Sequence, residues 1–138
     1  MKELNVAAGL ETFKVNGSFE YEFCPTDALF VEKLFSAFDA VEAKQDEYSK
    51  LTQNAEGKEI FAVAHRINDD IRDIINGAFD CDICSAVFGD VCIMALADGL
   101  PLWVNLLLAF IDEVDTSFAR EQKRTNPRIA KYTSKYHK

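Results

Sequence analysis

The residues of this chain best suited to chemistry are two closely spaced cysteines in the segment Asp80-Cys81-Asp82-Ile83-Cys84. A redox pair of this spacing needs a helix N-terminus and nearby cations, which lower the pKa of the first thiol. Here the two flanking aspartates oppose thiolate formation. Structural zinc would need two further ligands, for which Cys92 and His65 are the candidates, at a spacing typical of no familiar zinc module. We therefore predict small buried thiols rather than a metal or redox centre.

A second cluster, Asn68-Asp69-Asp70 with Asp73, places carboxylates at neighbouring positions of a helix. All-helical nucleotide pyrophosphohydrolases hold magnesium with two such acidic pairs on facing helices. Glu56 and Glu59 could form the second pair, although Gly57 lies between them and the connection to Asp70 is short. We prefer a solvated helix face. A magnesium-dependent pyrophosphohydrolase stays as an alternative.

The remaining polar residues predict no catalytic centre. The acidic run Asp112, Glu113 and Asp115 is also interpreted as a solvated helix face. His65 and His137 lie near no recognisable nucleophile motif, and the chain has no Gly-rich phosphate loop. We expect a protein without catalytic residues, bound cofactor or metal.

The first structural element is a β-hairpin, because apolar residues alternate with polar ones on both sides of Asn16-Gly17. A three-residue loop of Val15-Asn16-Gly17, with Gly17 left-handed, pairs Phe13 with Phe19 and Glu11 with Tyr21. We prefer this register because it gives one aromatic face, whereas a two-residue loop mixes apolar and acidic residues on each face. Three charged residues then face water: Lys14, Glu20 and Glu22.

Four helical stretches follow, and we predict no comparable further strand. The first predicted helix begins at Thr26-Asp27 and ends at about Leu51, and the second runs from about residue 60 to Asn76-Gly77. The third begins at Asp80 and ends at Asp98-Gly99, and the fourth runs from Pro101 to the break at Asn126-Pro127. Each has an apolar face at helical spacing, and the first is expected to run through Leu29, Phe30, Leu34, Phe35, Phe38, Val41 and Tyr48. The sequence thus predicts one mainly α domain, residues 1–138. In it, a hairpin (about 11–23) packs on a bundle of about four α-helices (about 26–123), followed by a basic tail (about 124–138) that is frayed or adds a short helix.

Charge is distributed unevenly along the chain. Residues 1–118 hold 22 acidic and 8 basic side chains, whereas residues 119–138 hold 1 and 7. The acidic body disfavours nucleic acid. The tail, with Tyr132 and Tyr136, could bind single-stranded nucleic acid or grip an acidic protein surface, and we prefer the protein partner.

The apolar segments predict neither export nor membrane insertion. The amino terminus has no apolar run of signal-peptide length. Residues 100–111 form the most apolar stretch, and a bilayer span needs about 20 such residues. We expect a cytoplasmic protein with reduced cysteines and no membrane contact.

The opening Thr12-Phe13-Lys14-Val15-Asn16-Gly17-Ser18-Phe19-Glu20-Tyr21-Glu22-Phe23, followed by helices, resembles tail assembly chaperones of siphoviruses and prophages of Gram-positive bacteria. Those proteins begin with a strand, an Asn-Gly turn and a second strand. The ending, from Ile129 to Lys138, is similar to basic, tyrosine-bearing ends of small proteins from the same tail-gene neighbourhoods.

This resemblance implies a non-enzymatic protein of the host cytoplasm that coats the tape measure protein during tail assembly and leaves before the virion is complete. The expected partner contacts are Phe13, Phe19, Tyr21, Phe23, Tyr132 and Tyr136. We also expect a homo-oligomer. The alternative is that the aromatic residues are core and the protein is a small homo-oligomeric interaction domain of unknown role.

Overall fold

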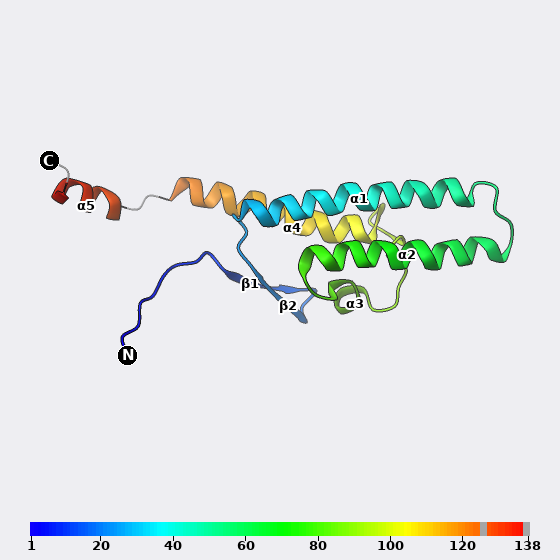
Figure 1. Ribbon diagram of the computed structural model, residues 1–138, viewed down its shortest axis with the longest axis horizontal. Helices are drawn as coiled ribbons and strands as arrows, with labels where there is room; N and C mark the ends of the chain where they lie inside the picture. The colour runs from blue at the N-terminus through cyan, green and yellow to red at the C-terminus, as the bar shows by residue number, and fades with distance from the viewer. Residues whose placement is uncertain (125–126, 137–138) are drawn as a thin grey trace.

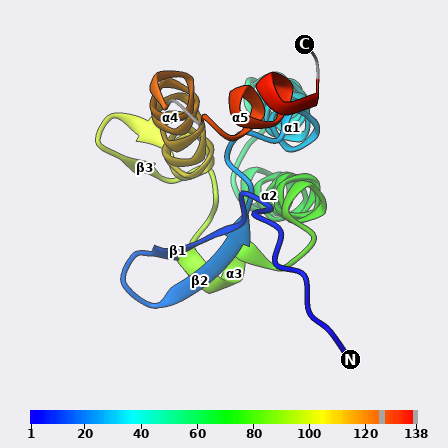
Figure 2. The same ribbon diagram turned by 90° about the vertical axis from the view of Figure 1, so that its left-hand side faces the viewer.

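The computed structural model describes residues 1–124 and 127–136, with the side chains of 132–134 and 136 left out. Its elements are β1 (Glu11–Val15), β2 (Phe19–Phe23), α1 (Ala28–Thr52), α2 (Lys58–Phe79), α3 (Ile83–Phe88), β3 (Leu96–Ala97), β4 (Leu100–Pro101), α4 (Leu102–Lys123) and α5 (Arg128–Tyr136). Three long helices, α1, α2 and α4, run side by side, and the hairpin β1–β2 packs against them together with α3 (Figures 1 and 2). The predicted mainly α fold with an N-terminal hairpin is confirmed. Within the described ranges, no helix combines the length and apolar character needed to cross a membrane.

The hairpin forms where the sequence predicts it, but in a different register. Val15 pairs with Phe19, Phe13 with Tyr21 and Glu11 with Phe23, so the loop is residues 16–18 and the predicted pairing is wrong. Gly17 is left-handed as expected, with φ 77°. A shift of two residues keeps every side chain on its predicted face, so the aromatic face and the exposed charges are retained. The observed register also brings Val15 out of the loop and into contact with the core.

α1 begins at the predicted cap, where the carboxylate of Asp27 accepts a hydrogen bond from the N–H of Leu29 at 2.9 Å. Its apolar face is narrower than predicted, because α2 and α4 cover only one side of it. Leu29 and Phe35 are exposed by 71% and 52%. The buried residues of α1 are Leu34, Ala37 and Val41.

α2 continues past the predicted stop at Asn76-Gly77 and ends at Phe79, so that boundary is wrong. The additional turn places Phe79 in the core, where it is 2% exposed. The side chain of Asn76 connects the end of α2 to α3, since it donates to Asp82 at 2.9 Å and accepts from the N–H of Cys84 at 3.1 Å. Asp82, rather than the predicted Asp80, therefore caps α3.

The predicted third helix is much shorter than expected and stops at Phe88. The chain then leads into β3 and β4, which form a small antiparallel hairpin through Asp98-Gly99. Both turn residues have positive φ, 55° and 78°, as a two-residue type I′ turn requires. The predicted helix end at Asp98-Gly99 and the predicted absence of a second hairpin are therefore both wrong.

Two polar side chains of α2 hold the irregular segment 89–95 in place. The guanidinium of Arg72 donates to the carbonyl oxygens of Gly89 and Val91 at 2.8 and 2.6 Å. The amide oxygen of Asn68 accepts from the N–H of Ile93 at 2.7 Å, and Ile93 is fully buried. These contacts satisfy backbone groups that a helix would have satisfied internally.

The second half of the chain ends in two helices. α4 begins directly after Pro101, as predicted, and buries Trp103, Leu106, Leu107, Phe110, Val114 and Ser117. The expected break at Asn126-Pro127 lies partly outside the described residues. Beyond it the basic tail forms the short helix α5, which lies past the end of α4 and away from the three long helices (Figure 1).

Candidate functional site

The predicted contact residues of the hairpin face the helices rather than solvent. Phe23 is buried at 5% exposure, and Phe13, Phe19 and Tyr21 are half-buried against the core. The side chains of the other two predicted contact residues, Tyr132 and Tyr136, lie outside the described part of the structure. A partner could therefore reach the four hairpin residues only along the margins of the hairpin.

Tyr21 connects the hairpin to the end of α2 through a hydrogen bond and ring packing. Its hydroxyl donates to the carbonyl oxygen of Phe79 at 3.0 Å. Its ring packs edge-on against the rings of Phe79 and Phe110, with centroids 5.4 and 5.8 Å apart. Burial, followed by the negative groups Cys81 and Asp80, raises the pKa of Tyr21 to about 12. The hairpin is thus held by both an aromatic cluster and a specific hydrogen bond.

One margin of the hairpin opens into an apolar cleft, which we call the hairpin cleft. It lies between β1 and α4, has a volume of about 260 Å³, and is lined by Phe13, Lys14, Val15, Asn16, Phe23, Ala109, Phe110 and Glu113. The rings of Phe13 and Phe23 lie 5.0 Å apart along it. Two predicted contact residues are therefore brought together here, while Phe19 and Tyr21 do not line the cleft. The charged side chains of Lys14 and Glu113 complete the lining.

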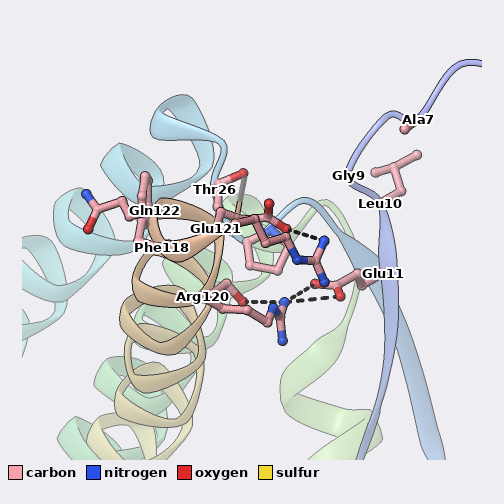
Figure 3. Close-up of a pocket in the computed structure, with 12 residues that line it drawn as sticks. Ala7, Gly9, Leu10, Glu11, Thr26, Phe118, Arg120, Glu121 and Gln122 are labelled. Atoms are coloured by element: carbon pink, nitrogen blue, oxygen red, sulfur yellow. Dashed lines mark hydrogen bonds and ion pairs between the residues drawn. The ribbon is translucent and has the colours of Figure 1, made fainter. Parts of the chain in front are cut away.

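A larger and more polar cleft lies where the N-terminal segment passes the end of α4 (Figure 3). This arm cleft has a volume of about 830 Å³ and is lined by residues 7 and 9–11 on one side and by residues of the last turns of α4 on the other. Arg120 crosses it to pair with Glu11 at 3.3 Å, and Arg124 pairs with Glu121 at 3.0 Å. Both cations are thus balanced by a carboxylate.

The thiols of Cys81 and Cys84 are disfavoured as thiolates, as the sequence predicts. Cys84 is fully buried, and burial raises the pKa of its thiol to about 12. Burial, then Asp82 and Asp80, raises the pKa of Cys81. The prediction of a buried thiol is right for Cys84 and wrong for Cys92, which is exposed. In residues 1–124 and 127–136, no three His, Cys, Asp or Glu side chains gather as a metal site requires.

Two members of the cluster on α2, Asn68 and Asp70, make contacts within the protein, whereas Asp69 and Asp73 are exposed as the sequence predicts. Asp70 pairs with Lys44 at 3.4 Å, and Glu47 also contacts Lys44, at 3.3 Å. The hydrogen bonds that Lys44 donates to Glu47 and then to Asp70 raise the pKa of Lys44. Asn68 holds the backbone of Ile93, as described above. The second acidic pair that the pyrophosphohydrolase alternative needs is not on a facing helix. Glu59 lies in the first turn of α2 and Glu56 just before that helix, and Asp70 lies later on the same helix.

Sequence reasoning missed the α4 wall of the hairpin cleft. Ala109 is exposed and Glu113 half-buried, so neither carries a pattern that distinguishes it from any other helix surface. The apolar periodicity of α4 did identify Phe110. The arm cleft was missed because residues 1–10 contain no motif. Comparison with protein-family models, curated proteins and solved structures finds no match to this chain.

Proposed function

We propose that this protein is a non-enzymatic binding protein that holds one apolar face of a partner helix in the hairpin cleft. The observation that carries the proposal is the cleft itself, an open apolar hollow beside a hairpin whose aromatic residues are already ordered by the core. A preformed apolar site loses little conformational entropy on binding. Its volume of about 260 Å³ accommodates one or two large apolar side chains of a partner.

The charges around the cleft suit reversible capture. Apolar contact supplies the affinity, in the way that grooves bind one face of an amphipathic helix. Lys14 on β1 and Glu113 on α4 offer opposite charges on the two walls, which favours one orientation of the partner. The net charge of -8 favours the solubility of the protein and of its complexes.

The resemblance of the hairpin opening to tail assembly chaperones of siphoviruses suggests the partner. We propose the tape measure protein, a long helical protein held in the host cytoplasm until tail assembly is complete. In this role the chain acts by covering apolar helix faces, and the partner leaves when those faces find their final contacts.

A pair of alanine substitutions on α4 tests the cleft. Ala109 lines the hairpin cleft, whereas Ala119 is also exposed on the same helix and lines neither cleft. With co-expressed tape measure protein and affinity capture, we expect Ala109→Glu to lower recovery of the partner about tenfold or more, because a charge enters an apolar site. Ala119→Glu should capture the partner like the unmodified protein.

Two outcomes would contradict the proposal. Equal recovery of the partner by both variants would exclude the hairpin cleft as its binding site. If the unmodified protein retains no tape measure protein at all, the partner is wrong. Both positions are exposed, so we expect both variants to keep their helices. Circular dichroism checks this.

A further inference from the structure

The solvent-facing side of α1 carries an exposed aromatic residue with carboxylate side chains around it. Phe35 is 52% exposed, and four carboxylates lie at helical spacing around it: Glu32, Asp39, Glu42 and Asp46, all exposed. Spacings of three, four and seven residues place them along one side of the helix. None of the ion pairs within the described ranges involves these four carboxylates. We call this surface the acidic face of α1.

α5 has the opposite character. Its basic residues Arg128, Lys131 and Lys135 are exposed and lie at spacings of three and four, so they share one side of the helix. Ile129, in the first turn of α5, is 79% exposed. A basic side with a neighbouring apolar residue is complementary to an acidic side that surrounds Phe35.

A chain can bring its own α5 only to the first part of its own acidic face. Trp103 of α4 packs on Phe38 of α1 with ring centroids 5.2 Å apart, and the two helices run in opposite directions (Figure 1). Lys123, at the end of α4, is 20 residues beyond Trp103, a distance of about 30 Å along the helix. The connection from Lys123 to α5 spans at most about 17 Å when fully extended.

The nine residues of α5 add about 12 Å to that reach. The far end of α5 would therefore only just arrive at the level of Phe38, whereas the acidic face continues for about another 12 Å to Asp46. The part of the face formed by Asp39, Glu42 and Asp46 therefore needs an occupant from a different molecule, and a second copy of the chain supplies a helix of the right charge.

We propose that α5 of one copy binds the acidic face of α1 on a second copy. If two copies exchange their α5 helices, both acidic faces are covered in one closed dimer. This contact is separate from the hairpin cleft, so it leaves the proposed partner site open. Exposed ion pairs dominate it, and salt therefore weakens it.

Charge reversal on the two surfaces tests the proposal with purified full-length protein. One variant carries Asp39→Lys with Glu42→Lys on α1, and the other carries Lys131→Glu with Lys135→Glu on α5. We expect the unmodified protein to dimerise reversibly in sedimentation velocity, with a dissociation constant that rises about tenfold or more between 50 and 500 mM NaCl. Each variant alone should be monomeric, because the two substituted positions on one surface would then meet like charges on the other. An equimolar mixture should restore the dimer, since each α5 again meets an opposite charge.

The matched control is Asp112→Lys with Asp115→Lys, which makes the same change of net charge on exposed positions of α4. It should dimerise at least as well as the unmodified protein. A monomeric unmodified protein, a mixture that stays monomeric, or a control that is disrupted as strongly as the α1 variant would each overturn the proposal. All substituted positions are exposed, and circular dichroism verifies that the helical content is unchanged.

Discussion

The hydrogen bond between Tyr21 and the end of α2 gives the sharpest test of how the hairpin is held. Tyr21→Phe removes the hydroxyl that donates to the carbonyl oxygen of Phe79 at 3.0 Å and keeps the ring in its aromatic cluster. The Phe79 carbonyl is one of the last four of α2, which have no partner within the helix. Losing a neutral hydrogen bond costs about 1 kcal/mol, and leaving its acceptor partly unsatisfied adds to that. We expect the free energy of unfolding to fall by about 1 to 2 kcal/mol.

Urea denaturation followed by circular dichroism measures this change, together with a melting temperature that should fall by roughly 4 °C per kcal/mol for a chain of this size. The effect should also depend on pH. The pKa of Tyr21 is about 12 in the folded protein and close to 10 in an unfolded chain. The stability that this shift contributes is fully present below pH 10 and is lost as the pH rises toward 12. The advantage of the unmodified protein over Tyr21→Phe should therefore narrow between about pH 10 and pH 12.

Tyr48→Phe is the matched control, because Tyr48 is half-buried on α1 and its hydroxyl makes no hydrogen bond within the described part of the chain. It should change the free energy of unfolding by less than about 0.5 kcal/mol. The reasoning fails if Tyr21→Phe is as stable as the unmodified protein at pH 8, or if its deficit stays constant as the pH is raised.

Two further predictions concern the connection between α2 and α4. Arg72→Met removes the guanidinium that holds residues 89–91, so we expect the free energy of unfolding to fall by about 2 kcal/mol. Amide hydrogen exchange should become faster in residues 89–95. A uniform rise of exchange across the chain would count against this role of Arg72. Burial raises the pKa of Cys84 to about 12, whereas Cys92 is exposed. Iodoacetamide at pH 8 should therefore label Cys92 about tenfold faster or more, by mass spectrometry of peptides, and similar labelling rates would refute the assignment of Cys84 to the core.

The elements that the sequence predicts correctly are those encoded within a few neighbouring residues. The alternation around Asn16-Gly17 gives the hairpin and its aromatic face, because side chains on a strand alternate between its two sides. Asp27 sets the start of α1 and Pro101 that of α4, because each acts on the first turn alone. These signals need no knowledge of the rest of the chain.

The elements that it predicts wrongly depend on distant contacts. Asn76-Gly77 and Asp98-Gly99 are both consistent with the end of a helix. The first lies inside α2 because one more turn buries Phe79, and the second closes a hairpin. The shortened α3 depends on Arg72 and Asn68, which satisfy the backbone of residues 89–93 from the preceding helix, 17 to 25 residues earlier.

The hairpin cleft also has one wall that the sequence could identify and one that it could not. Phe13 and Phe23 could be named from the sequence because the strand pattern marks them as one face of the hairpin. The opposite wall of the hairpin cleft, Ala109 and Glu113, comes from almost a hundred residues later and has no local signature. Whether an aromatic side chain is core or contact surface depends on which helix covers it, and this is decided only when the chain has folded.

By itself, the sequence determined the mainly helical fold, the opening hairpin and the separation of an acidic body from a basic end, since periodicity, capping and charge are local properties. Tertiary structure alone decided the register of the hairpin, the small second hairpin, the two clefts and the distance that keeps α5 from the far part of the acidic face of α1. The physical reason is that burial and backbone satisfaction are shared among residues far apart in the chain, so a local pattern that allows two conformations is resolved only by its neighbours in space.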